Sequence, residues 1–254
     1  MLTRKDLSSY RQITGFTLGQ IEKDYLQHIF LSILYRSIKD ELVFKGGTAL
    51  QKTYGLNRFS EDLDFTLHAD IDIDKVLQKA LTGLNIFGCE STKRKKKDVA
   101  HGLIYVVTIK GPLFTGAEHS NSFIRLEISK REQVFLAPII HTITPLYIDL
   151  PPYSVSVMNP SEIMAEKIRA LLTRNKARDI YDLWFLIQKQ ITTTTQLINK
   201  KLQYYNLVFD FETLKKSIEQ KEKVWTKEMK LLIPLKIKFT DITQSIFSQQ
   251  FIEE

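Results

Sequence analysis

A stripe of apolar side chains at helical spacing is the first clear pattern in the chain. Its members recur every four residues and charged residues fall outside it, which predicts an amphipathic helix over residues 20–40. The stripe consists of Ile21, Tyr25, Ile29 and Ile33. Leu26 and Phe30 widen it, so the expected apolar face of this helix is broad.

Short apolar runs alternate with helical segments after this helix. The runs at residues 42–45 and 62–67 predict two strands. Between them, residues 48–54 predict a helix that Gly55 ends. Residues 73–84 predict one more helix.

The pattern changes twice further along the chain. β-branched residues broken by Gly and Pro predict three strands, at residues 103–109, 123–129 and 154–157. From Pro160 onward the pattern is helical almost to the C-terminus. We therefore expect a mixed domain of helices and strands at residues 1–157 and a helical domain at residues 158–254.

Asp62 and Asp64 are candidate metal ligands. Side chains two residues apart on a strand point to the same face, so the two carboxylates are expected to lie side by side. They repel each other unless a cation lies between them. A hard divalent ion such as Mg²⁺, or Mn²⁺ in its place, suits carboxylate oxygens and usually binds triphosphate oxygens as well. The alternative is a solvated pair of surface charges.

The Gly46-Gly47-Thr48 turn precedes this carboxylate pair in the sequence. Glycine lets the backbone approach a phosphate closely, and the amides at the start of the next helix are available to bind it. Arg58 and Ser60, just before the pair, are further candidates for phosphate contact. A glycine turn followed by Asp-x-Asp therefore indicates transfer of a nucleotide from an NTP, although each feature alone is common.

These motifs and three later segments resemble the AbiEii/AbiGii toxin family. That family contains the nucleotidyltransferase-like proteins of type IV toxin–antitoxin and abortive-infection systems. The resemblance implies an α+β fold, in which a DNA polymerase β-like nucleotidyltransferase domain, with a mixed sheet and flanking helices, is followed by a helical-bundle domain. The similar segments are Lys45–Leu50, Tyr54–Phe65, Arg125–Ser129, Asn159–Arg174 and Lys176–Leu183.

Glu127 is a candidate third carboxylate of the metal site. In polymerase-like transferases, an acid on a further strand binds metal and activates the attacking hydroxyl. Arg125 is expected on the same strand face as Glu127. The family usually has lysine and aspartate at these two positions, and the longer glutamate changes the metal geometry. The alternative is a surface Arg–Glu pair on an edge strand.

The remaining candidates lie in the predicted helical domain. The resemblance implies a functional lysine at Lys167, which would contact the triphosphate. The alternative is a lysine that covers apolar surface. The resemblance also places the segment containing Arg178, Asp179 and Asp182 in the site. Arg178 and Asp182 are four residues apart and are expected to pair on a helix, so a purely structural role stays open.

The charge balance favours a polyanionic acceptor. The chain has a formal net charge of +7 and a sequence pI near 9.2. Residues 93–97, Lys-Arg-Lys-Lys-Lys, predict a basic loop that either is solvated or contacts phosphates of RNA. We therefore expect an RNA acceptor, and the toxin resemblance favours tRNA. A small-molecule or protein acceptor, or a non-catalytic nucleotide- or RNA-binding protein, are the alternatives.

Compartment and partners follow from what the sequence lacks. Cys89 is the single cysteine, which excludes an intramolecular disulfide. Residues 1–11 are polar and charged, unlike a secretory signal, and no apolar run approaches the roughly 20 residues of a membrane span. We expect a cytoplasmic protein without membrane contact. The resemblance adds a possible cognate antitoxin as a partner.

Overall fold

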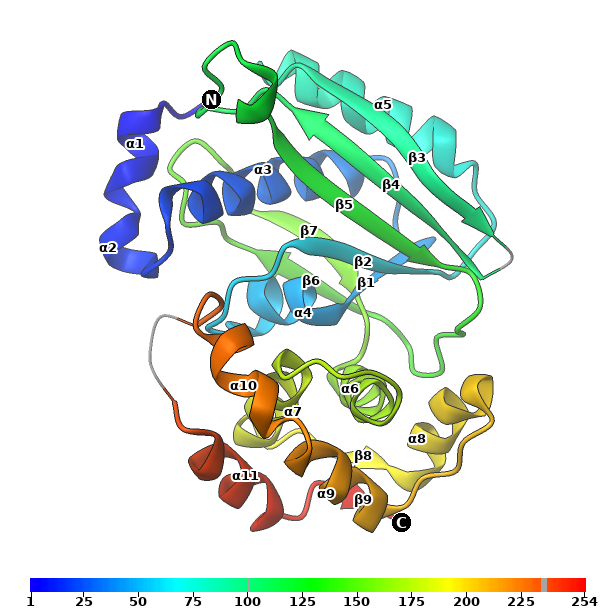
Figure 1. Cartoon of the computed structure of the whole chain (residues 1–254). Helices are drawn as coiled ribbons and strands as arrows, with labels where there is room; N and C mark the ends of the chain where they lie inside the picture. Colours follow the sequence, from blue (N-terminus) through cyan, green and yellow to red (C-terminus); the bar gives the residue numbers. More distant parts are fainter. Residues whose placement is uncertain (100, 234–236) are drawn as a thin grey trace. The chain divides into compact units, whose positions relative to one another are not determined.

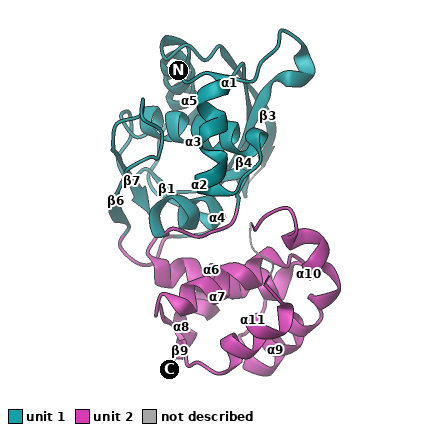
Figure 2. Ribbon diagram, turned by 90° about the vertical axis from the view of Figure 1, so that its left-hand side faces the viewer, with its two compact units in different colours: residues 1–54, 59–133, 138–157 teal, residues 55–58, 134–137, 158–254 magenta. Residues whose placement is uncertain are grey.

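The computed structural model describes residues 1–99, 101–233 and 237–254 (Figure 1). The chain divides into two compact units (Figure 2). Unit 1 consists of Met1–Tyr54, Phe59–Gln133 and Pro138–Val157. Unit 2 consists of Gly55–Arg58, Val134–Ala137 and Met158–Glu254. The sequence pattern gives no sign that the two short segments before residue 158 belong with the helices that follow it.

Unit 1 contains a seven-stranded sheet in the order β3-β4-β5-β2-β1-β7-β6. The pairs β2·β5 and β1·β7 are parallel and the other pairs are antiparallel, so the sheet is mixed as expected. Its strands are β1 (Leu42–Lys45), β2 (Asp62–Leu67), β3 (Ser91–Val99), β4 (Gly102–Ile109), β5 (Ser122–Ser129), β6 (Ile139–Ile143) and β7 (Tyr153–Val157). The predicted strands are confirmed, and β3 and β6 are additional.

The helices of unit 1 are α1 (Arg4–Ser9), α2 (Arg11–Thr14), α3 (Leu18–Leu34), α4 (Gly46–Ala49) and α5 (Ile73–Ile86). One π-helical turn, η1 (Leu50–Tyr54), extends α4, and a 3₁₀ turn, η2 (Glu118–Ser120), precedes β5. The predicted helix over residues 20–40 ends earlier, at Leu34, because the chain turns there to enter β1.

Helices α3 and α5 pack against each other closely. A Cβ added at Gly83 of α5 would lie 2.4 Å from Cγ2 of Ile33 in α3, so only glycine allows this approach. The sheet face that α5 covers is identified by register. Leu63, Leu126 and Tyr105 are successive cross-strand partners, and Lys95, the next partner, binds Asp74 of α5. The apolar side chains of β2, β4 and β5 therefore face this helix layer.

The expected basic loop at residues 93–97 is wrong, because these residues lie within strand β3. β3 pairs antiparallel with the apolar strand β4, with a bulge between Lys95 and Lys97. It is an edge strand, so its charged side chains reach water or a partner such as Asp74. A run of charges hides strand pairing because it carries no apolar alternation to read.

Unit 2 is mostly helical, as expected. Its helices are α6 (Pro160–Thr173), α7 (Arg178–Gln188), α8 (Thr195–Leu202), α9 (Phe211–Glu219), α10 (Glu222–Met229) and α11 (Phe239–Phe247), with a 3₁₀ turn η3 (Gln203–Tyr205). Strands β8 (Thr193–Thr194) and β9 (Ile252–Glu253) form a small parallel pair. The predicted start of α6 is confirmed: Pro160 is in its first turn and the Asn159 side chain accepts the N–H of Ser161.

A buried lysine cluster explains why the segment 134–137 belongs to unit 2. The Nζ of Lys201, in α8, lies 2.6 Å from Glu162 Oε1 and 3.1 Å from Glu166 Oε1, both in α6. The Glu162 carboxylate also accepts the N–H groups of Phe135 and Leu136. One carboxylate thus holds both the buried ammonium and the segment's backbone.

Within the described residues, every helix is too short or too polar to span a bilayer.

Candidate active site

Strand β2 places Asp62 and Asp64 on the sheet face opposite α3 and α5. Both side chains are half-buried, whereas Leu63 and Phe65, which alternate with them, are buried in the core. In the parallel pairing with β5, Asp62 is the partner of Arg125 and Asp64 is the partner of Glu127. Cross-strand partners point to the same face, so the three predicted carboxylates share one surface.

Glu127 interacts with its strand neighbour on this surface. Arg125 Nη2 lies 2.5 Å from Glu127 Oε1, and both side chains are partly exposed. Among the described residues there is no group of three or more His, Cys, Asp or Glu arranged to hold a metal ion. Asp62 and Asp64 nevertheless fit a hard cation, since they present carboxylate oxygens on one face of one strand. Glu127 shares that face but is turned toward Arg125.

Lys45 and Glu132 join this surface, although the sequence reasoning did not include them. Lys45 ends the apolar strand β1 and is the cross-strand partner of Asp64. It is buried, and its Nζ lies 2.9 Å from Oε2 of the buried Glu132. The signal available in the sequence was a charged residue at the end of an otherwise apolar strand, directly before the glycine turn.

Gly46 permits the position of Asp64. Its φ is +77°, a left-handed backbone conformation that favours glycine. A Cβ at Gly46 would lie 2.3 Å from Asp64 Oδ2, which is far inside contact distance. The first glycine of the turn therefore makes room for the carboxylate, in addition to any approach of a phosphate.

The side chain of Thr48 supports the strand that carries the carboxylate pair. It is fully buried, and its hydroxyl donates a 2.5 Å hydrogen bond to the carbonyl oxygen of Asp62. A phosphate contact by Thr48 would therefore come from its backbone N–H. Gly47, beside it at the start of α4, is also buried.

Two glutamines hold the backbone just before Asp62. Gln27 of α3 donates from Nε2 to the carbonyl oxygens of Ser60 and Glu61, at 3.1 and 2.9 Å. Gln51 of η1 accepts the N–H of Ser60 through Oε1, at 3.1 Å. Its Nε2 donates to Asp24 Oδ1, also at 3.1 Å. Ser60 is thus fixed through its backbone by two side chains that the sequence did not single out.

Gln51 connects this backbone to a buried polar network through Asp24. Lys52 Nζ lies 2.9 Å from Asp24 Oδ1, and the Tyr147 hydroxyl donates to Asp24 Oδ2 at 2.8 Å. Burial raises the pKa of Asp24, but the charge of Lys52 and the hydrogen bonds from Lys52 and Tyr147 outweigh it, so its pKa lies below the ordinary value. Burial, and secondarily Lys52, lower the pKa of His28 to about 3. The histidine is therefore neutral, and Tyr153 OH lies 2.8 Å from its Nδ1.

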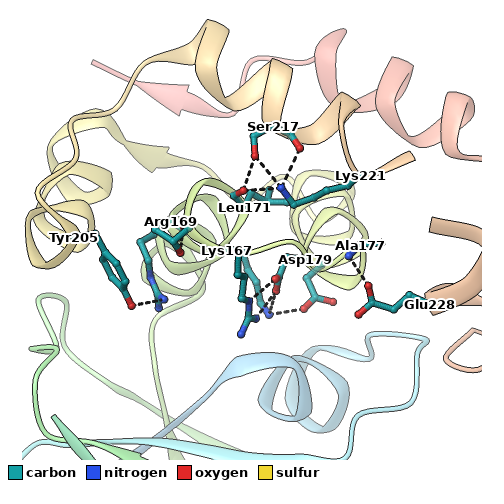
Figure 3. A network of polar contacts seen from close by, with 12 residues as sticks. Lys167, Arg169, Leu171, Ala177, Asp179, Tyr205, Ser217, Lys221 and Glu228 are labelled. Atoms are coloured by element: carbon teal, nitrogen blue, oxygen red, sulfur yellow. Dashed lines mark hydrogen bonds and ion pairs between the residues drawn. The ribbon is translucent and has the colours of Figure 1, made fainter. Parts of the chain in front are cut away.

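Lys167, Asp179 and Asp182 form a second cluster, within unit 2. Figure 3 shows Lys167 and Asp179. Lys167 Nζ of α6 lies 3.1 Å from Asp179 Oδ1 and 2.6 Å from Asp182 Oδ2, both in α7. Arg174 donates to both oxygens of Asp179, from Nε at 2.8 Å and from Nη2 at 2.9 Å. Burial raises the pKa of Asp179, but Lys167 and Arg174 outweigh it, so the pKa lies well below the ordinary value. Lys167 is buried between carboxylates rather than spread over apolar surface.

Arg58 is the arginine that binds Asp182. Its Nε and Nη2 donate to the two oxygens of Asp182 at 2.6 and 2.7 Å, and both side chains are buried. Burial raises the pKa of Asp182, but Arg58 and then Lys167 lower it below its ordinary value. The expected helical pair of Arg178 with Asp182 is replaced by this contact: Arg58 binds both oxygens of the buried carboxylate, and Lys167 lies against one of them. Of the predicted site residues, Arg58, Lys167, Asp179 and Asp182 thus form one group in unit 2, and Arg178 lies half-buried at the start of α7 outside these contacts.

Lys221 binds the backbone near the C-terminal end of α6, in the same unit. Lys221 Nζ donates to the Leu171 carbonyl oxygen at 2.8 Å and to Ser217 Oγ at 2.8 Å (Figure 3). Ala177, which precedes α7, donates its N–H to Glu228 Oε2 at 2.6 Å. These contacts fix both ends of the connection between α6 and α7, which carries Arg174.

Comparisons with known proteins identify the family of the chain. A family model described as "Nucleotidyl transferase AbiEii toxin, Type IV TA system" matches residues 32–245. A search of proteins with curated function gave no significant match. The match to the family model covers both the sheet of unit 1 and the α6–α7 pair of unit 2.

Two solved structures are similar to the chain. JHP933 from Helicobacter pylori has a TM-score of 0.62 and 22% identity, over 91% of this chain and 90% of its own. MenT4, a nucleotidyltransferase toxin from Mycobacterium tuberculosis H37Rv, has a TM-score of 0.56 and 20% identity, over 89% of this chain and 72% of its own. These likenesses show a common fold, and the family match goes further. Because that match spans most of its length, the chain belongs to the AbiEii family of nucleotidyltransferases, the toxins of type IV toxin–antitoxin systems.

Proposed function

We propose that the chain transfers a nucleoside monophosphate from an NTP to RNA, with tRNA as the favoured acceptor, and releases pyrophosphate. The observation that carries this proposal is the shared face of Asp62, Asp64 and Glu127, set in register beside the turn at Gly46. Modification of tRNA would stop translation, which accounts for toxicity. The family implies a cognate antitoxin as a partner. A cytoplasmic location is proposed because NTPs and tRNA occur there.

Asp62 and Asp64 would hold Mg²⁺ or Mn²⁺, with Glu127 as the third candidate ligand. A bound divalent ion neutralises triphosphate charge and orients the in-line attack of the acceptor hydroxyl. The chain prepares for this through Gly46, which leaves room for the Asp64 carboxylate, and through Thr48, which fixes the Asp62 backbone. Glu127 would accept the proton of the attacking hydroxyl at a carboxylate oxygen.

We propose nucleotide contacts for residues of both groups. Backbone N–H groups of Gly46, Gly47 and Thr48 would bind phosphate oxygens, and Ser60 would add its hydroxyl. In unit 2, Arg58, Lys167 and Arg178 would supply positive charge for the nucleotide. Asp179 and Asp182 would act by holding Lys167 and Arg58 in fixed orientations, since they already bind both.

The experiment is a labelling reaction with total bacterial RNA. The purified chain is incubated with Mg²⁺, RNA and each of the four NTPs labelled at the α-phosphate, and the products are separated on a gel. We expect label in an RNA band with at least one NTP, and none when EDTA is added or with Asp64→Asn. If the wild-type chain labels no RNA with any NTP, the proposed acceptor is wrong.

A further inference from the structure

The basic residues of β3 divide between the two faces of the sheet. Lys93 and Lys95 are the cross-strand partners of Val107 and Tyr105, which face the helix layer. Their Nζ atoms lie 2.7 and 2.9 Å from the carboxylate oxygens of Asp74 in α5. These two lysines are therefore engaged on the covered side of the sheet.

Arg94 and Lys97 project from the opposite face. Their partners in β4 are Val106 and Ile104, and the bulge at Lys96 preserves this orientation beyond Lys95. Both side chains are exposed. The bulge therefore places a second cation on the face that Arg94 occupies, instead of returning it to the helix layer.

Register connects this pair of cations to the candidate active site. Val106 pairs with Arg125, which pairs with Asp62. Ile104 pairs with Glu127, which pairs with Asp64. Two rows thus run across β3, β4, β5 and β2, and three strand spacings of ~4.8 Å make each row about 14 Å long.

The surface between the cations and the Asp pair is apolar and partly open on β4, and it is charged on β5, where Arg125 and Glu127 lie. Ile104 and Val106 are half-buried, while their neighbours Leu103, Tyr105 and Val107 are buried on the other face. The two rows thus begin with a cation, continue with an aliphatic side chain and end in a carboxylate, with Arg125 or Glu127 at the third position. This order suits a ligand with a repeating anion, a flat apolar part and a terminal hydroxyl. A single-stranded polynucleotide has all three.

We infer that Arg94 and Lys97 bind backbone phosphates of the acceptor strand, whose bases lie over Ile104 and Val106 and whose terminal hydroxyl reaches Asp62 and Asp64. This inference rests on the proposed function and adds the path of the acceptor. A free nucleotide has no further phosphate to place at a second site about 14 Å from the carboxylates. Edge-strand lysines that only prevent association of sheet edges would serve equally from either face.

The two faces of β3 supply a matched pair of variants. Arg94→Gln/Lys97→Gln and Lys93→Gln/Lys95→Gln each remove two positive charges from the same strand. The binding of a fluorescent single-stranded oligoribonucleotide with a free 3′ hydroxyl is measured by anisotropy at several salt concentrations. For the first variant, the slope of log K against log salt should fall by about 1.4, which corresponds to two phosphate contacts on a single strand. For the second variant, the slope should stay as in the wild-type chain.

Two further readouts separate this inference from the proposed function. Urea unfolding midpoints show whether either variant is misfolded, and NTP affinity should be unchanged in both. If the wild-type chain labels RNA but the two variants bind the oligoribonucleotide equally, the path over Arg94 and Lys97 is wrong and the proposed function stands. If the wild-type chain labels no RNA, the proposed function is wrong, and the acceptor path that rests on it is wrong as well.

Discussion

Asp64 and Glu127 are direct cross-strand partners in the parallel pairing of β2 with β5. They lie 63 positions apart in the sequence, as their residue numbers show, and only the register of two strands brings them to one face. A slip of one residue would move Glu127 to the helix-covered side, because side chains alternate along a strand. The pairing of these strands is therefore as important to the site as the identity of the acids.

Replacing either member of the Asp pair should remove activity without unfolding the chain. Asp62→Asn and Asp64→Asn take away a hard oxygen donor, so RNA labelling should fall by about a hundred- to a thousandfold, the order expected when charge stabilisation is lost. The unfolding midpoint should stay or rise slightly, since two half-buried carboxylates on one strand repel each other. A variant that labels RNA at the wild-type rate would contradict the assignment.

Gly46→Ala should disturb Asp64 specifically. The new Cβ would meet Asp64 Oδ2 at 2.3 Å, and the backbone at φ +77° would be strained. We expect a loss of about 1–3 kcal/mol in the free energy of unfolding, together with a large loss of RNA labelling. Gly88→Ala is the matched control, because Gly88 also has a positive φ, +94°, but has nothing within 4 Å of its Cβ. Equal losses of activity in both variants would show that strain alone is responsible.

The sequence predicted β1 and β2 residue for residue, and for a physical reason. Each is a short run with apolar side chains bounded by turn residues, and local pattern suffices for such strands. Strand β3 was missed because its charges conceal the pairing with β4, which is a tertiary contact. Asp62 and Asp64 were found from their spacing, and the other candidate acids from the family resemblance. The Lys45–Glu132 pair and the two glutamines required the fold.

The arginine bound to Asp182 could not be predicted from the sequence either. Helical spacing favours Arg178, which is the nearest basic residue at the right distance along α7. Arg58 lies 124 positions upstream, and no local pattern indicates that it belongs to unit 2. Buried charges select the partner that satisfies them most completely, and that choice depends on the three-dimensional arrangement.

Arg58→Gln should destabilise unit 2 strongly, whereas Arg178→Gln should not. Removing Arg58 leaves the buried Asp182 with Lys167 as its remaining ion-pair partner among the described contacts, so we expect a loss of about 3 kcal/mol in the free energy of unfolding. Arg178 is only partly buried, and its replacement should change that free energy by less than about 0.5 kcal/mol. Fluorescence of Trp184 and Trp225, both in unit 2, reports the unfolding. If both variants lose a similar free energy of unfolding, Arg178 does bind Asp182 and the assignment to Arg58 alone is wrong.

Buried His28 should make unit 1 less stable as the pH falls below neutrality. Its pKa is about 3 in the folded chain and 6.5 as an ordinary value, so below pH 6.5 the unfolded chain binds a proton that the folded chain does not. Stability is therefore fully present above about pH 6.5 and is lost progressively toward pH 3. Between pH 7 and 5.5 the loss should be about 1 kcal/mol, before most carboxylates begin to titrate.

Urea unfolding at these two pH values, followed by circular dichroism, measures the effect. The groups around His28 are Asp24, Lys52, Tyr147 and Tyr153, and burial outweighs the attraction of Asp24 for a charged imidazole. His28→Gln cannot take up this proton, so its free energy of unfolding should change by about 1 kcal/mol less over the same pH range. His119→Gln removes an exposed histidine and should keep the wild-type pH dependence. If His28→Gln and the wild-type chain lose the same free energy of unfolding on acidification, the pH dependence does not come from His28.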